Sequence, residues 1–106
     1  MITPNSTTSN LAKKDCILTT VSIVGLKWSV LIIKEMVNSP KRFCELEHAI
    51  PNITPRILSK RLNELESFKI IKFDLNNGRP LYSLTSKGLD LYPIIEQMVK
   101  WGQKYI

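Results

Sequence analysis

The sequence predicts a mainly helical fold with one small β-hairpin, an α+β class, and three observations indicate it. Apolar residues recur at helical spacing in five successive stretches. A strong turn signal, Asn76-Asn77-Gly78, separates a segment over 70–75 that is rich in β-branched and aromatic residues from a second predicted strand over 81–84. The 106 residues are 43% hydrophobic and 23% charged, which is the composition of one ordinary globular domain.

We expect the chain to begin with a flexible arm over residues 1–12, which are rich in Ser, Thr and Asn. A single domain then covers residues 13–106. Its first helix is expected to begin near Asp15, a residue type suited to an N-cap, and to end at Gly25. A second helix is predicted over about 27–37 and ends at an Asn-Ser-Pro turn.

The third and fourth helices are predicted on either side of a break at Pro51-Asn52. The third is short and covers about 42–49. The fourth, over about 54–67, has the clearest signals in the chain, because Thr54 is an N-cap type and Pro55 suits the first helical position. Three leucines share one side of this helix, which we expect to be buried: Leu58, Leu62 and Leu65.

Polar residues form a stripe along the opposite side of the fourth helix. They occupy positions i, i+3, i+4 and i+7, with no acidic residue among them: Arg56, Ser59, Lys60 and Asn63. Many charged helix faces are only solvated surface. The capped start and the adjacent hairpin favour contact with a DNA major groove instead, and Thr54 at the helix start is included among the predicted contacts.

The hairpin is predicted over about 70–84, with its turn at Asn76-Asn77-Gly78 and Arg79 near the tip. Lys72 and Arg79 are its two cations. One interpretation is that they contact the DNA backbone or a minor groove. The other is that they only keep an edge strand from aggregating. Arg42, just before the third helix, is a further candidate phosphate contact, with an internal salt bridge as its alternative.

The last helix is predicted from Thr85-Ser86 to about Tyr105, with a kink or a break at Pro93. Apolar residues cover about half of its circumference, which is wider than one core contact requires. The excess predicts a second partner, most simply another copy of the chain. The residues expected at this dimer interface are Leu91, Ile95, Met98, Trp101 and Tyr105.

A short helix, a tight turn, a basic helix and a hairpin, in this order, describe a winged helix-turn-helix. The residues that add a family resemblance are Cys16, Val24-Gly25-x-Lys27-Trp28, Arg42-Phe43-x-Glu45-Leu46, Ile50-Pro51-x-Ile53-Thr54, Leu58-x-x-Arg61-Leu62-x-x-Leu65-Glu66, Arg79-Pro80, Tyr82-x-Leu84-Thr85-x-x-Gly88-x-x-Leu91 and Trp101. This string resembles the HxlR-type transcriptional regulators, which are related to the MarR regulators. The resemblance covers residues 16–101.

The resemblance implies a homodimeric regulator that binds double-stranded DNA, with the fourth helix in the major groove and the hairpin as a wing on flanking DNA. It also implies that Cys16 is a candidate sensor of oxidants or electrophiles, as in some relatives. Nearby Lys13 and Lys14 favour a reactive thiolate and Asp15 opposes it. The alternative for Cys16 is a buried, inert thiol.

Composition limits which partners and which other classes of function the chain can have. The formal charge of +6 favours a polyanionic partner, most often a nucleic acid. Two recognition helices related by a two-fold axis would bind a pseudo-palindromic DNA operator. Two cysteines and one histidine leave few options for a disulfide scaffold, a metal site or acid–base catalysis. No apolar run approaches the roughly 20 residues of a membrane span. We expect a cytoplasmic protein that is not an enzyme and needs no cofactor. The alternative function is a winged helix that binds only proteins.

Overall fold

The fold is taken from a computed structural model, which describes residues 27–106. The elements, in chain order, are α2 (Lys27–Met36), α3 (Phe43–Ala49), α4 (Pro55–Ser67), β1 (Ile71–Asn76), β2 (Arg79–Leu84) and α5 (Ser86–Tyr105). The helices predicted at about 27–37, 42–49 and 54–67 are therefore confirmed, as is the hairpin. The predicted arm, the predicted first helix and Cys16 lie outside the described residues.

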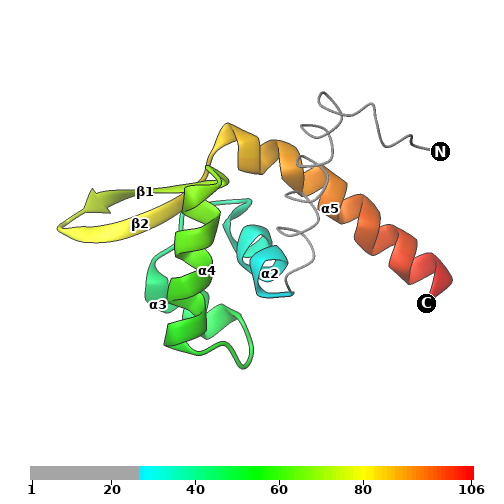
Figure 1. The fold of residues 1–106 in the computed structure, drawn as a ribbon, viewed down its shortest axis with the longest axis horizontal. Coiled ribbons are helices and arrows are strands. Elements are labelled where there is room, and N and C mark those ends of the chain that lie inside the picture. Colours follow the sequence, from blue (N-terminus) through cyan, green and yellow to red (C-terminus); the bar gives the residue numbers. More distant parts are fainter. Residues whose placement is uncertain (1–26) are drawn as a thin grey trace, which may run out of the picture.

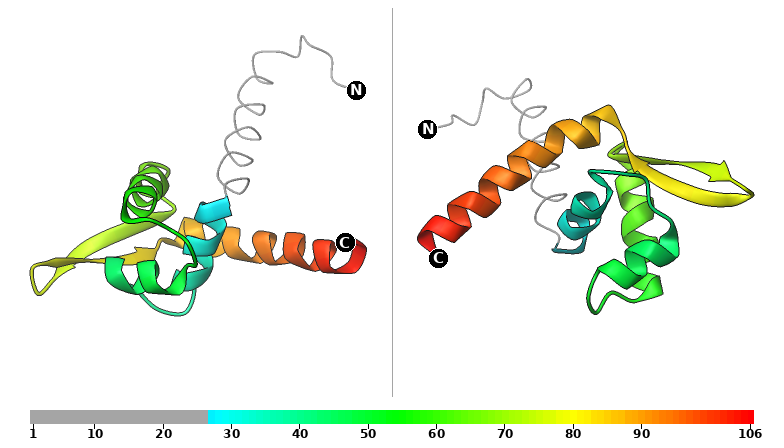
Figure 2. Two further views of the ribbon diagram at one scale, coloured as in Figure 1. Left: turned by 90° about the horizontal axis from the view of Figure 1, so that it is seen from below. Right: turned by 180° about the vertical axis from the view of Figure 1, so that it is seen from behind.

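The elements form a helical centre with two extensions. Helices α2, α3 and α4 pack together, and the β1–β2 hairpin extends from them on one side (Figure 1). Helix α5 crosses α2 and then extends away on the opposite side, as both further views show (Figure 2). This is the arrangement of a winged helix-turn-helix, with the hairpin as the wing.

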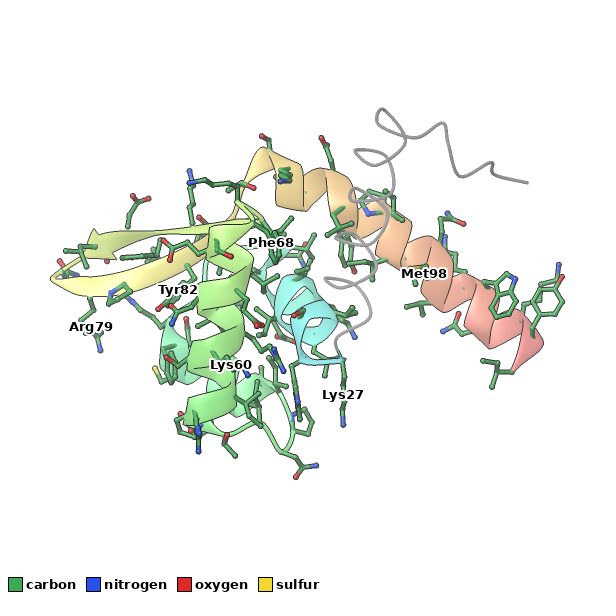
Figure 3. The ribbon with its side chains drawn as sticks, in the orientation of Figure 1. Lys27, Lys60, Phe68, Arg79, Tyr82 and Met98 are labelled. Carbon is green, nitrogen blue, oxygen red and sulfur yellow. The ribbon has the colours of Figure 1, made fainter. Side chains whose placement is uncertain are left out.

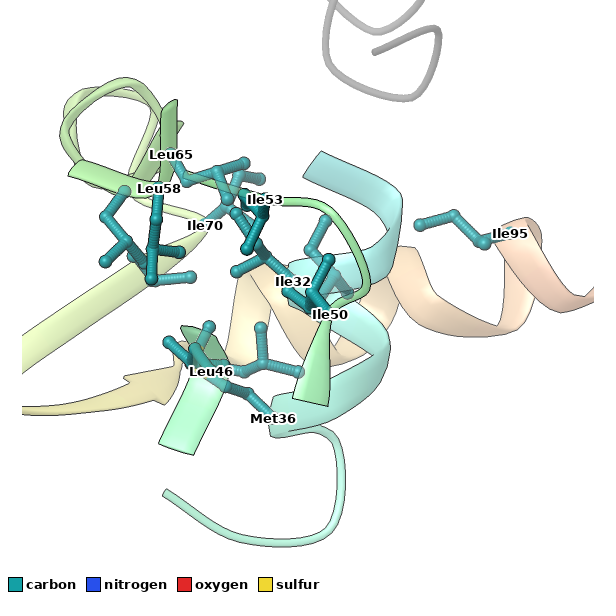
Figure 4. Close-up of a cluster of buried hydrophobic side chains, with 13 residues drawn as sticks. Ile32, Met36, Leu46, Ile50, Ile53, Leu58, Leu65, Ile70 and Ile95 are labelled. Carbon is teal, nitrogen blue, oxygen red and sulfur yellow. The ribbon is translucent and has the colours of Figure 1, made fainter. Parts of the chain in front are cut away.

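The core lies where α2, α3, α4 and the base of the hairpin meet (Figure 4). It includes the predicted inner face of α4, since Leu58, Leu62 and Leu65 are all buried. Helix α5 adds Ile95, which points toward α2 (Figure 4). The remaining buried hydrophobic residues are Ile32, Ile33, Met36, Leu46, Ile50, Ile53, Ile70, Ile71 and Leu84.

Helix α4 begins and ends with local hydrogen bonds that fix its position. The Thr54 hydroxyl oxygen accepts a hydrogen bond from the Ile57 backbone N–H at 3.1 Å, so the predicted N-cap is confirmed. At the other end, Lys69 adopts a left-handed conformation with φ of 63°. The following Ile70 N–H then reaches back to the Leu65 carbonyl at 3.0 Å, which turns the chain directly into β1.

The hairpin closes through a two-residue turn at Asn77-Gly78, with φ of 55° and 75°. Two positive φ angles in succession identify the type I′ geometry that suits a right-twisted hairpin. The strands run up to this turn, with Asn76 paired to Arg79 and Ile71 paired to Leu84. Strand β2 is therefore longer than the predicted 81–84 and includes Pro80.

Helix α5 is anchored at its start and continues to its end without a break. Thr85 caps it, with its hydroxyl oxygen accepting from the Gly88 N–H at 3.1 Å. A Cβ on Gly88 would lie 2.3 Å from the Ile70 carbonyl oxygen, so only glycine fits this close approach. Of the two alternatives predicted at Pro93, the break is wrong and the kink stays a prediction. The carbonyl that loses its donor belongs to Leu89, an exposed residue, so water can replace the missing N–H.

Candidate nucleic-acid interface

The polar stripe of α4, defined as Arg56, Ser59, Lys60 and Asn63, lies on the surface of the molecule. All four residues are exposed, whereas Leu58 on the opposite side is completely buried. Within residues 27–106, none of the four side chains takes part in a hydrogen bond or an ion pair with another residue. Their donors and acceptors are therefore free to bind another molecule.

The acidic residues of α4, Glu64 and Glu66, flank the polar stripe and are not part of it. Glu64 forms an ion pair with Arg61, which is half-buried. The pairing neutralises one carboxylate beside the stripe and leaves the cations Arg56 and Lys60 to set its charge. The arrangement can therefore attract the phosphates of a nucleic acid and present hydrogen-bonding groups to base edges.

The wing carries its charges on one of its two faces. Cross-strand pairing places Lys72 opposite Ser83, and Arg79 opposite Asn76. Because side chains alternate along a strand, Lys72, Asp74 and Arg79 share this face. All three are exposed. Arg79 lies near the free end of the hairpin (Figure 3). Asp74 lies two residues from Lys72 on the same strand and is its nearer charged neighbour.

The other face of the wing is apolar and stiffens the base of the hairpin. Phe73 and Tyr82 pair across the strands with ring centroids 5.8 Å apart. Burial, and secondarily the negative charge of Glu66, raises the pKa of Tyr82 above its ordinary value. The Tyr82 phenol is therefore neutral at physiological pH.

Arg42 is held against the wing. Its guanidinium donates hydrogen bonds to the carbonyl oxygens of Arg79 at 2.8 Å and Pro80 at 3.3 Å, and to the Asn76 side-chain oxygen at 2.6 Å. These acceptors are neutral, so within residues 27–106 the internal salt bridge expected as an alternative is not formed. A phosphate contact through the remaining N–H groups stays a prediction.

Helix α5 has an outer apolar stripe, defined as Ile94, Met98, Trp101 and Tyr105. These positions follow i, i+4, i+7 and i+11 and so lie in line on one side of the helix. Their exposed fractions are 57%, 54%, 60% and 62%. Met98 lies on the part of α5 that extends away from the wing (Figure 3). The stripe is an apolar surface of the kind that marks a protein contact.

The predicted interface residues of α5 divide into two groups. Met98, Trp101 and Tyr105 belong to the outer stripe, whereas Ile95 is only 4% exposed and Leu91 is half-buried. Ile95 belongs to the core of the chain and offers little surface to a partner. Ile94 was not among the residues predicted for the interface, and the structure places it on the outer stripe.

Other chemistry is sparse in the part of the chain that the structure describes. Among residues 27–106, no three His, Cys, Asp or Glu side chains gather where they can hold a metal ion. No helix in this range combines the length and hydropathy needed to cross a membrane. His48 is exposed on α3, and Cys44 beside Glu45 is an exposed free thiol.

The fold and the polar stripe of α4 define a winged helix-turn-helix protein of the DNA-binding type. Residues 23–106 match the model of the HxlR-like helix-turn-helix family. The chain belongs to this family, which confirms the predicted resemblance, and it is a helix-turn-helix transcriptional regulator.

Similar proteins agree with this assignment. The chain is 40% identical over 89 residues to YvaP, an uncharacterised HTH-type transcriptional regulator of Bacillus subtilis, covering 81% of this chain and 82% of YvaP. Quinone-bound YodB from B. subtilis has a similar structure, with a TM-score of 0.76, 32% identity, and coverage of 84% of this chain and 96% of YodB. The redox regulator HypR in its oxidised form also has a TM-score of 0.76, with 33% identity and coverage of 85% and 96%.

Proposed function

We propose that two copies of this chain bind a pseudo-palindromic DNA operator, with α4 in the major groove and the wing on the flanking backbone or minor groove. The observation that carries the proposal is the polar stripe of α4. It is exposed, free of internal partners within residues 27–106, free of acidic residues, and placed on a capped helix beside a wing. A helix of about 10–12 Å diameter fits a major groove about 12 Å wide.

The residues of the stripe suit different parts of a duplex. Arg56 lies in the first turn of α4, where recognition helices commonly contact base edges, and its guanidinium can bind guanine O6 and N7 together. Asn63, two turns further on, can pair with adenine N6 and N7. Ser59 and Lys60 suit phosphates. The Thr54 hydroxyl accepts from Ile57, but its own hydrogen remains a donor for a phosphate oxygen.

A second copy of the chain is the partner that the outer apolar stripe of α5 supports. The stripe is long, straight and more than half exposed, and its Trp101 and Tyr105 rings lie 5.2 Å apart. Large aromatic side chains are common at the centres of protein interfaces. A two-fold dimer would present two α4 helices about 34–36 Å apart, or a multiple of that, to successive turns of one face of the duplex. A cytoplasmic location agrees with this function.

We further propose that DNA binding responds to an oxidant or electrophile through Cys16. The support comes from the relatives, since YodB is known in a quinone-bound form and HypR in an oxidised form. Lys14 and Lys13 lie two and three positions before Cys16 and favour the thiolate, whereas the adjacent Asp15 opposes it. The Cys16→Ser variant should therefore bind DNA equally well before and after oxidant treatment.

Selection of bound sequences from a random duplex pool tests the whole proposal. The wild-type chain should enrich a pseudo-palindrome, and the enrichment should change after oxidant treatment. With roughly 6–10 phosphate contacts per dimer, affinity for the selected site should fall about 10³–10⁵-fold between 50 and 200 mM salt. Binding that ignores salt, or no enrichment of any sequence, would contradict the proposal.

A further inference from the structure

Arg42 occupies a position that does not suit its residue type. It is the N-cap of α3, where an oxygen-bearing side chain normally accepts a hydrogen bond from the first turn. A guanidinium has no acceptor, and its positive charge is unfavourable near the positive end of a helix dipole. The capping contact is supplied instead by Glu45, whose carboxylate accepts from the Arg42 backbone N–H at 2.7 Å. The Arg42 side chain therefore has another role.

That role is visible in what the guanidinium binds. Its three hydrogen bonds reach both strands of the wing close to the turn: Asn76 on β1, and Arg79 and Pro80 on β2. These partners are 34 to 38 residues away in sequence. One nitrogen serves the two carbonyls and the other serves the Asn76 oxygen, which uses the planar fork of the guanidinium. Arg42 thus binds the two ends of the β-turn together.

The neighbouring backbone strengthens this connection. Lys41 and Tyr82 exchange two backbone hydrogen bonds, each 2.8 Å long, so the segment before α3 pairs with the free edge of β2. Arg42 then extends the contact from Tyr82 outward to the turn. Together, these bonds attach the wing to the start of α3 along half of its length.

The attachment matters because the wing has few other contacts. Only its base, at Ile71 and Leu84, is buried, and residues 72–80 are all exposed. A two-stranded hairpin without further packing is only marginally stable in water. Helix α3 packs against α4 through the core, where Leu46 and Leu58 are both buried. A continuous path of contacts therefore runs from the wing tip through Arg42 and α3 to α4.

We propose that Arg42 is a positioning residue that fixes the wing tip, and so the Arg79 side chain, relative to the polar stripe of α4. The proposal rests on the proposed function, in which Arg79 touches DNA beside the groove that α4 enters. Arg42 acts on DNA affinity through Arg79, by reducing the conformational freedom that the wing would otherwise lose on binding.

A direct phosphate contact by Arg42 makes different predictions. Lysine keeps the positive charge but lacks the planar fork, so Arg42→Lys should preserve most of a phosphate contact and lose most of the attachment to the wing. Arg79→Ala removes the Arg79 side chain but leaves the carbonyl that Arg42 binds. Comparing Arg42→Lys with and without Arg79→Ala therefore separates the two roles.

The experiment is a double-mutant cycle on DNA affinity and on its salt dependence, using a duplex selected by the wild-type chain. Arg42→Lys should weaken binding about threefold to tenfold with Arg79 present, and change it less than about twofold in the Arg79→Ala background, since residues in one network couple. Lys41→Ala is the matched control, because Lys41 contacts Tyr82 only through its backbone. Any effect of Lys41→Ala should be the same in both backgrounds.

A second variant tests the attachment without DNA and without a change of charge. Asn76→Ala removes one acceptor of Arg42. Hydrogen exchange at the backbone amides of residues 76–79, 81 and 82 should accelerate in both Asn76→Ala and Arg42→Lys, while amides of α4 keep their wild-type exchange rates. Unchanged exchange in the wing would overturn the proposal, and faster exchange throughout the domain would show that Arg42 supports the whole fold instead.

The outcomes also separate this inference from the proposed function. If Arg79→Ala weakens DNA binding but Arg42→Lys weakens it equally in both backgrounds, Arg42 does not act through Arg79 and only the inference fails. If Arg42→Lys binds like wild type, the inference fails as well. If Arg79→Ala leaves affinity and salt dependence unchanged, the wing does not contact DNA, and both the wing part of the proposed function and the inference are overturned.

Discussion

Helices α4 and α5 differ in what they expose, although each buries one face in the same core. Opposite its buried leucines, α4 presents the polar stripe with two cations. Beside the buried Ile95, α5 presents the outer apolar stripe, with Trp101 and Tyr105 about 60% exposed. Packing within the chain explains why the inner faces are apolar, but it does not explain the residues on the outer faces. The chemistry of the outer faces supports the two proposed partners, a nucleic acid for α4 and a second copy of the chain for α5.

The largest expected effect comes from a charged substitution in the outer apolar stripe of α5. Trp101→Asp places a charge in the outer stripe, where it would be buried without a partner in a dimer. Sedimentation should show the mass fall from twice that of the chain to that of one chain. Affinity for an intact operator should fall roughly 10²–10⁴-fold, because the two half-sites are no longer bound together.

Gln103→Asp is the control for this change. Gln103 is exposed and lies about 180° around α5 from the outer stripe, so it adds the same charge away from the predicted interface. It should stay dimeric. A wild-type chain that sediments as a monomer, or a dimer that survives Trp101→Asp, would contradict the proposed interface.

The second prediction concerns two adjacent isoleucines of α5, one on its inner face and one on its outer face, and their effects on stability. Ile95 is 4% exposed and Ile94 is 57% exposed. Ile95→Ala should lower the free energy of unfolding by about 2–4 kcal/mol, because it leaves a cavity in the core. Ile94→Ala should lower the stability of the isolated chain by less than about 0.5 kcal/mol. Urea denaturation in the Trp101→Asp background, where the dimer does not contribute, makes this measurement.

The third prediction tests whether the polar stripe of α4 reads DNA bases. Arg56→Ala should cost about 1–3 kcal/mol of binding free energy at the selected operator and relax the preference at one position in each half-site. The Arg56 side chain is exposed and makes no hydrogen bond or ion pair within residues 27–106, so the melting temperature should not change. Sequence selection with the variant, beside a thermal melt, checks both parts. An unfolded Arg56→Ala chain, or unchanged base preference, would show that Arg56 does not read bases.

Most of this fold could be predicted because its signals are local. The cap at Thr54 and the Asn77-Gly78 turn each depend on a few consecutive residues, and both are confirmed. The polar stripe also follows from helical spacing alone. The wide apolar arc of α5 predicted a second partner, but spacing did not distinguish Ile95 from Ile94. That distinction depends on where α2 lies against α5, which is a tertiary property.

Long-range contacts account for what sequence reasoning missed. The hydrogen bonds of Arg42 join residues more than 30 positions apart, and nothing near Arg42 in the sequence indicates the wing as its partner. The break expected at Pro93 also depended on information that the local sequence does not give, namely which side of α5 faces water. Proline lowers helix stability locally, but its missing hydrogen bond falls on an exposed part of α5, where the helix can tolerate it.

The smallest expected effect is that of Lys72→Ala. Lys72 lies in the middle of the wing, and the comparison is with Arg79→Ala at the tip. Lys72 and Arg79 share one face of the hairpin, but Asp74 lies beside Lys72 on that face and partly offsets its charge. Lys72→Ala should therefore weaken DNA binding less than Arg79→Ala and reduce the salt slope by less than the value of about 0.9 expected for one full phosphate contact. Its stability should stay within about 0.5 kcal/mol of wild type, since Lys72 is exposed and outside the core.

Asp74→Ala is the matched variant and should strengthen binding, because it removes a carboxylate from the same face. If Lys72→Ala instead costs as much as Arg79→Ala, the whole face of the wing lies along the DNA backbone, and the tip has no special role.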